Sequence, residues 1–335
     1  MKKRTVLYVV VAVVLVLAVA LVGGSFYMVD FSLHPDPTRA NRDSCYEQLY
    51  TNYPETLPWV DSLQAVGALR DTFVVMPTGE RHHAYFIKGR TPKTAIVVHG
   101  WRDQAIKWFC LAQLYEQALG YSVVIPDLHA CGASEGDAIG MGWNDRLDVR
   151  HWMQLFRADT MVVHGVSMGA ATTMMLSGEP MPEGISDLRF VADCGYTSVW
   201  DEFAGQLHEQ FGLPPFPLLY SSSLLCKLRY GWSFGEASAL SQVSRCPYPM
   251  FFIHGDSDDF VPTAMVHRLY DAKKGMKQLW ITSDTDHAHS YKNHRAEYTR
   301  RVHEFLMKQQ STHKNYEESH FIPSHLSRLP DTPGC

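Results

Sequence analysis

The sequence predicts an α/β fold with a mostly parallel central sheet that is covered by helices on both faces. Short apolar strands alternate with helical stretches from residue 71 to residue 310, and one strand turns sharply into a helix near residue 167. The chain is 46 % apolar and 19 % charged, which suits a globular domain with a sizeable core. Alternating strands and helices favour parallel pairing, and ligands of such sheets bind beyond the carboxyl ends of the strands.

Each element is predicted from apolar runs and from the turn residues that bound them. Residues 30–70 are expected to form a helical lead-in, and the polar tail 311–335 has little apolar periodicity. Strands are expected at 72–76, 83–87, 95–99, 122–126, 161–164, 190–193, 250–254 and 278–282. Helices are expected at 105–119, 144–156, 262–273 and 292–310.

Composition also narrows the range of partners. The 335 residues carry a net charge of −5 without a basic stripe, so nucleic acid is not an expected partner. None of the seven cysteines forms a Cys-x-x-Cys pair, so no metal site is expected. Buried free thiols are expected for most of them, with a disulfide between Cys226 and Cys246 as the alternative.

The N-terminal segment has the composition of a membrane anchor. A basic stretch at residues 2–4 precedes residues 5–29, which carry no charge and exceed the about 20 residues that span a bilayer. We expect residues 1–29 to lie outside the fold as an anchor in the lipid bilayer. A cleaved secretory signal is the alternative, although Val22-x-Gly24 is a poor cleavage site. In both cases the positive flank stays inside and the rest of the chain is extracytoplasmic.

The stretch 197–246 is longer than a plain crossover and rich in aromatic residues and leucine. It is expected to form a small helical lid over the carboxyl ends of the strands. Phe211 and Trp232 are its candidates for contacting an apolar substrate. The alternative is that these side chains form the ordinary core of a helical subdomain.

The run Gly165-Val166-Ser167-Met168-Gly169 lies between an apolar strand and a helix. Gly165 and Gly169 remove side chains where strand and helix nearly touch, which allows a strained Ser167 backbone. Ser167 is the candidate nucleophile, and the Met168 N–H at the helix N-terminus is a candidate donor to an oxyanion. The Trp101 N–H, which follows the strand 95–99, is the second candidate donor. The alternative is a packing turn with an inert serine.

A serine nucleophile also needs a base and an acid that orients the base. In this topology the chain order is serine, acid, histidine. Asp258 is the leading acid after the strand 250–254, with Asp256 and Asp259 as alternatives. His287 and His289 both follow the last strand within reach of the serine.

Five sequence pieces in this order resemble the α/β-hydrolases. The chain is similar to the membrane-anchored bacterial branch related to serine aminopeptidases and monoglyceride-lipase-like hydrolases. The resemblance implies that Asp258 is the acid and His287 the base, and that the turn after Asp127 is scaffold. The pieces are His99-Gly100-Trp101, Asp127-Leu128-His129-Ala130-Cys131-Gly132-Ala133-Ser134-Glu135-Gly136, Gly165-Val166-Ser167-Met168-Gly169, Gly255-Asp256-Ser257-Asp258-Asp259-Phe260-Val261-Pro262 and His287-Ala288-His289-Ser290-Tyr291.

These residues predict a serine hydrolase that cleaves a small carboxylic ester through an acyl-enzyme and needs no cofactor. The alternative within the same fold is a serine aminopeptidase. No acidic cluster in the lid can be assigned to a free amine, so the ester is the leading prediction. A non-catalytic anchored protein that binds a ligand is the third hypothesis.

Overall fold

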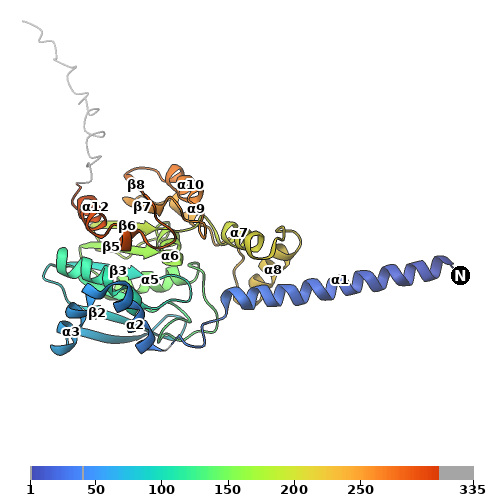
Figure 1. The fold of residues 1–335 in the computed structure, drawn as a ribbon, viewed down its shortest axis with the longest axis horizontal. Coiled ribbons are helices and arrows are strands. Elements are labelled where there is room, and N and C mark those ends of the chain that lie inside the picture. The colour runs from blue at the N-terminus through green and yellow to red at the C-terminus, as the bar shows by residue number, and fades with distance from the viewer. Residues whose placement is uncertain (1, 40, 309–335) are drawn as a thin grey trace, which may run out of the picture.

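An eight-stranded sheet forms the centre of the computed structural model, which describes residues 2–39 and 41–308 (Figure 1). The strand order is β1-β2-β4-β3-β5-β6-β7-β8, in which β2 is antiparallel to β1 and β4 and the other neighbours are parallel. The mostly parallel sheet predicted from the sequence is therefore confirmed. The strands are β1 (Leu69–Val75), β2 (Arg81–Ile87), β3 (Lys93–Val98), β4 (Ser122–Pro126), β5 (Thr160–Val166), β6 (Asp187–Asp193), β7 (Met250–Gly255) and β8 (Lys277–Thr282).

Helices cover both faces of the sheet and bury a separate apolar cluster on each. The first cluster lies under α5 (Asp145–Leu155), α6 (Met168–Leu176), α9 (Ala239–Val243) and α10 (Ala264–Ala272). The second lies under α2 (Arg42–Asn52), α3 (Leu57–Ala65), α4 (Phe109–Gln113) and α12 (Arg295–Met307). Central strands such as β3 and β5 are buried on both sides, which explains why their sequences are continuous apolar runs.

Two predicted helices are interrupted. The stretch 105–119 divides into η2 (Ala105–Trp108), α4 and η3 (Leu114–Ala118), because its hydrogen-bond spacing widens along the chain. The final helix divides into α11 (Ser290–Asn293) and α12 at His294, whose backbone (φ −129°, ψ 36°) is not helical. The predicted tail 311–335 lies outside the described residues.

The N-terminal helix α1 (Lys2–Leu33) runs past the boundary predicted at residue 29. By length and composition it can cross a membrane or serve as a signal sequence. Its exposed apolar part ends near Gly24, and from Ser25 onward one side of it is buried against the domain. Val29 and Leu33 belong to the first apolar cluster, so the last turns of α1 are part of the fold.

The predicted lid consists of α7 (Val199–Phe211) and α8 (Leu218–Tyr230), which lie at the end of the domain from which α1 projects (Figure 1). Helix α8 lies against α1, whereas α9 at the end of the insertion packs on α6. The six cysteines among the described residues are buried free thiols, and these include Cys226 and Cys246. The alternative disulfide between those two is therefore absent.

Candidate active site

Ser167 lies at the sharp turn between β5 and α6, with φ 57° and ψ −122°. A Cβ atom at Gly165 would lie 2.0 Å from the Gly169 carbonyl oxygen, and one at Gly169 would lie 2.1 Å from that of Val98. Only glycine fits at both positions, as the sequence indicated. The Ser167 N–H donates to the Asp193 carbonyl oxygen at 2.9 Å, which fixes the turn against β6.

The Ser167 hydroxyl is hydrogen-bonded to His287. The hydroxyl donates to His287 Nε2 at 2.8 Å, and His287 Nδ1–H donates to Asp258 Oδ2 at 2.8 Å. The base comes from the loop after β8 and the acid from the turn after β7, so both lie at the carboxyl edge of the sheet. This serine–histidine–aspartate chain is the arrangement that makes a hydroxyl nucleophilic.

Several polar contacts hold the Asp258 carboxylate in place. Its Oδ1 accepts from the Val261 N–H at 2.9 Å, and its Oδ2 lies 3.2 Å from Nε2 of the buried His254. Burial by itself would raise the pKa of Asp258, but hydrogen bonds from His254 and His287 outweigh it and lower the pKa to about 2. The carboxylate is thus ionised at neutral pH, the state in which it orients and stabilises the histidine.

The alternative residues of the sequence analysis lie elsewhere. His289 is half-buried and bonded to Asp286 at 2.5 Å rather than to Ser167. Asp256 is exposed and accepts from Ser257 and from the Thr285 N–H, so it ties two loops together. Asp259 is exposed. The structure therefore brings together Ser167, His287 and Asp258 and leaves these three aside.

Comparison with known proteins gives the same fold. Over 257 residues the chain is 31 % identical to the uncharacterized protein YqkD of Bacillus subtilis, which covers 73 % of this chain and 82 % of that protein. The esterase Pf2001 of Pyrococcus furiosus superposes with a TM-score of 0.57 at 22 % identity, over 71 % of this chain and 89 % of its own. An esterase from Exiguobacterium antarcticum superposes with a TM-score of 0.53 at 14 % identity, over 71 % of this chain and 100 % of its own.

The chain belongs to the same family as YqkD and has the α/β-hydrolase fold. The acylaminoacyl peptidase of Pyrococcus horikoshii shares the fold, with a TM-score of 0.53 at 16 % identity over 74 % of this chain and 42 % of that one. No family model matches the sequence. The predicted α/β-hydrolase fold is therefore confirmed, whereas the serine aminopeptidase branch is not.

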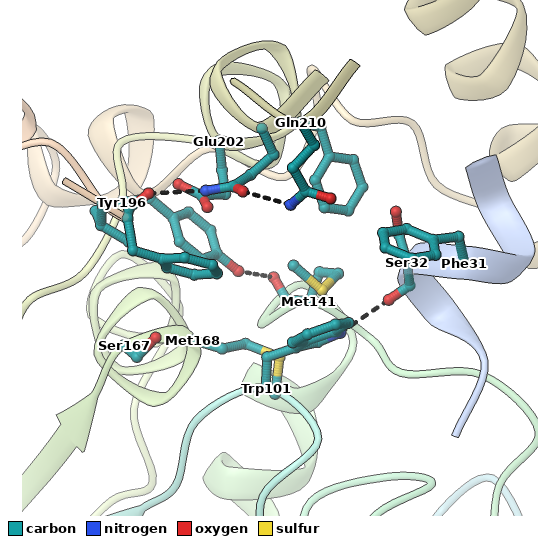
Figure 2. Close-up of a pocket in the computed structure, with 13 residues that line it drawn as sticks. Phe31, Ser32, Trp101, Met141, Ser167, Met168, Tyr196, Glu202 and Gln210 are labelled. Carbon is teal, nitrogen blue, oxygen red and sulfur yellow. Dashed lines mark hydrogen bonds between the residues drawn. The ribbon is translucent and has the colours of Figure 1, made fainter. Parts of the chain in front are cut away.

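The predicted oxyanion donors border the same cavity as the serine. Trp101 and Met168 both line it with Ser167 (Figure 2). At Gly100 a Cβ atom would lie 3.5 Å from Ser167 Cβ, so the loop after β3 passes directly over the nucleophile. The Trp101 ring reaches outward, and its Nε1–H donates to the Ser32 carbonyl oxygen of α1 at 2.8 Å.

The cavity beside Ser167 has a volume of about 150 Å³ and extends from the serine to α1. Its walls are mostly apolar, with Met141 on the loop before α5 and Phe203 on the lid helix α7. Figure 2 shows Ser167 at one end and Phe31 and Ser32 of α1 at the other. This shape suits an elongated apolar ligand whose reactive group lies at the serine.

The two lid residues predicted to contact the substrate do not line this cavity. Trp232 is 3 % exposed and borders a different cavity with Glu80 and His129, because it packs in the first apolar cluster. Phe211 packs edge-on against Phe31, with ring centroids 6.3 Å apart, behind the cavity wall. The prediction is therefore corrected: Phe203 is the lid aromatic that faces the cavity.

The sequence analysis missed a polar row on α7. Glu202, Gln206 and Gln210 follow one another at a spacing of four residues and all line the cavity. Burial raises the pKa of Glu202, a hydrogen bond with Gln206 lowers it, and the charge of Asp258 raises it. The net result is a pKa of about 8. Glu202 is thus uncharged at neutral pH and can donate a hydrogen bond. The spacing was visible in the sequence, but not the face of α7 that turns inward.

Two groups of side chains have ligand atoms within 4.8 Å of one another and could hold a metal ion. Cys194 with Asp258 and His287 overlaps the serine site, and Glu80 with His82 and His129 borders the cavity beside Trp232. Burial would lower the pKa of His129, but Asp145 and Glu80 raise it on balance. His129 is bonded to Glu80 at 3.2 Å, while the two ring nitrogens of the buried His82 have no hydrogen-bond partner among the described residues.

Proposed function

We propose that this chain is a membrane-anchored serine hydrolase that cleaves carboxylic esters. The observation that carries the proposal is the hydrogen-bonded chain from Ser167 through His287 to Asp258, with both bonds at 2.8 Å and the serine on a strained turn. A hydroxyl held in this way loses its proton to the histidine as it attacks a carbonyl carbon.

The reaction proceeds in two halves on these residues. Ser167 Oγ attacks the ester carbonyl while His287 Nε2 takes its proton, and Asp258 stabilises the resulting imidazolium. The Trp101 and Met168 N–H groups hold the negative oxygen of the tetrahedral intermediate. His287 then gives its proton to the departing alcohol, and water releases the acyl group from Ser167 by the same steps in reverse. None of these steps requires a cofactor.

The walls of the cavity favour an ester with an apolar acyl part. Each CH₂ group buried there contributes about 0.8 kcal/mol, roughly a fourfold gain in specificity per carbon. The structural relatives named as esterases are consistent with this chemistry. We therefore expect kcat/KM on nitrophenyl esters to rise from acetyl towards medium chains and to fall once the cavity of about 150 Å³ is full.

A peptidase is the second candidate, and Glu202 is the observation that favours it. A carboxyl group in the cavity can pair with the free amine of a peptide substrate, which would pull the pKa of Glu202 down from about 8. One structural relative is named as an acylaminoacyl peptidase. Faster cleavage of aminoacyl anilides than of any ester would decide for this candidate.

Labelling with a fluorophosphonate tests the proposal most directly. The full chain in detergent should be labelled, and Ser167→Ala should remove both the label and at least about 10⁴-fold of the ester turnover. Ser257→Ala is the matched control, because Ser257 is an exposed serine beside the site whose hydroxyl donates to Asp256. Undiminished labelling of Ser167→Ala would refute the nucleophile, and an unlabelled, inactive wild type would favour the non-catalytic hypothesis.

The anchor is part of the same proposal. The exposed apolar surface of α1 up to Gly24 suits lipid, and the basic residues before it favour a cytoplasmic N-terminus with an extracytoplasmic domain. The full chain should resist extraction by salt or carbonate, because burial in hydrocarbon rather than charge holds it. A mature N-terminus close to Ser25 would instead show a cleaved signal.

A further inference from the structure

We infer that the substrate is an amphiphilic ester of the bilayer in which α1 is anchored, and that Phe31 and Ser32 of α1 form the outer wall of its pocket. The inference rests on the proposed function, that is, on Ser167 as the nucleophile and α1 as a membrane span. It adds the source of the substrate and a residue that selects it.

The first step is that α1 enters the domain directly from the membrane. Residues 5–24 supply the about 20 residues that cross the hydrocarbon layer, and their side chains are largely exposed. Ser25 follows at once as a buried residue, 4 % exposed. Membrane span and folded domain are therefore consecutive parts of one helix, and no spacer lifts the domain off the bilayer.

The second step is that the last turns of α1 are fixed to the hydrolase domain. The Ser25 hydroxyl donates to the Ser221 hydroxyl of α8 at 2.7 Å, and the Ile139 N–H donates to the Leu33 carbonyl oxygen at 2.7 Å. The Arg102 side chain donates to the carbonyl oxygen of Phe31 at 2.9 Å. Lid and catalytic loops thus hold the same helix, which sets the height of the pocket above the bilayer.

The third step is that this height is small. Phe31 is six residues beyond Ser25, about 9 Å along a helix axis. The headgroup layer of one leaflet is about 5–8 Å thick, the difference between the hydrocarbon core and the whole bilayer. The Phe31 end of the cavity therefore lies close to the outer edge of the headgroup layer, with Ser167 at the far end of the cavity (Figure 2).

The fourth step is the apolar surface of the lid beside α1. On α8, Tyr220, Leu224 and Leu228 recur at a spacing of four residues and are 56–77 % exposed, and Phe216 before the helix is 72 % exposed. Such a row of large apolar side chains in water marks an interaction surface. Because α8 packs on α1 just where α1 leaves the hydrocarbon, the bilayer is the occupant that covers this row.

The walls of the pocket suit such a substrate. An acyl chain that rises from the leaflet past Phe31 meets apolar walls on the way to Ser167, whereas the polar row on α7 offers hydrogen bonds to an uncharged headgroup. Pulling a lipid wholly into water would cost about 0.8 kcal/mol per CH₂. A pocket that opens at the headgroups avoids this cost, since the rest of the lipid stays in the bilayer.

The test uses the full chain reconstituted into phosphatidylcholine vesicles with a fluorogenic long-chain monoacylglycerol ester as the probe. The probe is placed either in the same vesicles as the enzyme or in separate ones. We expect cleavage in the shared bilayer to be at least tenfold faster. Phe31→Ala should lower kcat/KM for the probe about tenfold more than it lowers kcat/KM for nitrophenyl acetate, because only the long chain reaches the outer wall of the pocket, and the variant should still be labelled by the fluorophosphonate.

The matched control is Phe26→Ala, an exposed phenylalanine of the same helix that does not line the pocket. It should leave all three readouts unchanged. Equal rates for shared and separate vesicles, or equal loss in Phe31→Ala and Phe26→Ala, would overturn the inference while labelling and nitrophenyl acetate turnover persist. Loss of labelling and of nitrophenyl acetate turnover in the wild type would instead refute the proposed function, so the two failures are distinguishable.

Discussion

The two ends of the pocket are built differently. At the inner end, Ser167, His287 and Asp258 project from turns at the carboxyl edge of the sheet and are joined by directed hydrogen bonds. At the outer end, Phe31 from the N-terminal helix faces a lid helix, and the contacts are mostly apolar packing. Under the proposed function, the sheet carries the catalytic residues, whereas α1 and the helical insertion form the wall that selects the substrate.

Buried polar groups reinforce the inner end. The Asp193 carboxylate accepts from the Ser290 hydroxyl at 3.1 Å and from the Tyr298 hydroxyl at 3.0 Å, while its backbone oxygen holds the Ser167 N–H. Ser290 belongs to the same loop and helix region as His287. Nucleophile and base are thus positioned through one buried residue of β6.

The largest effect is expected from the base. His287→Ala should lower kcat about 10⁴-fold or more, because the serine then has no proton acceptor, whereas His289→Ala should remain within about threefold of wild type. Both variants should be assayed on a soluble ester and with the fluorophosphonate. If His289→Ala were the inactive variant, the inner end would be built on the other histidine of the loop.

The second largest effect is expected from the acid, Asp258. Asp258→Asn should lower kcat about 10³- to 10⁴-fold, because the amide cannot hold His287 in the required tautomer. Asp256→Asn is the matched control in the same turn and should change kcat less than about threefold. Comparable losses in both variants would mean that the turn as a whole, rather than one carboxylate, positions the base.

These two predictions concern the part of the molecule that the sequence describes well. The glycines around Ser167 and the order serine, acid, histidine follow from local turn chemistry, so the residues are identified before their neighbours are known. The choice between His287 and His289 does not follow from the local sequence alone. It depends on which side chain the loop turns towards β5, and the structure turns His289 to solvent and Asp286.

The outer end depends on contacts between distant segments and was largely missed. An apolar run of α1 is sufficient to predict a membrane span, but nothing within it shows that Val29 and Leu33 are buried in the domain core. The lid aromatics likewise do not show which of them faces inward. Phe203 does so, while Trp232 packs in the first apolar cluster.

Truncations of α1 distinguish the role of its exposed first part from that of its buried last turns. A chain that begins at Ser25 loses only the exposed part, so it should be soluble and keep wild-type activity on nitrophenyl acetate. A chain that begins at His34 also loses Val29 and Leu33, each worth about 1.5–3 kcal/mol of burial, and its Tm should fall by roughly 5 °C or more. Thermal unfolding of both chains measures how much the last turns of α1 stabilise the domain. Equal Tm values for the two chains would contradict the prediction.

The smallest expected effect lies on the polar row of α7. The pKa of Glu202 is raised from 4.5 to about 8. Burial and Asp258 raise it, and the hydrogen bond with Gln206 lowers it by less. The folded chain therefore keeps a proton that the unfolded chain releases above pH 4.5, so the free energy of unfolding falls as pH rises from 4.5 through 8. Glu202→Gln removes this dependence.

The measurement is the Tm of Glu202→Gln and of wild type at pH 5 and at pH 9. The variant should match wild type at pH 5 and exceed it at pH 9, and wild-type kcat/KM for an uncharged ester should fall a few-fold above pH 8 while that of the variant does not. Glu209→Gln, an exposed position on the same helix, should follow wild type at both pH values. A Tm difference that is the same at both pH values would mean that Glu202 is already ionised in the folded protein. The row would then present a negative charge to the substrate, and a free amine rather than an uncharged headgroup would be its natural partner.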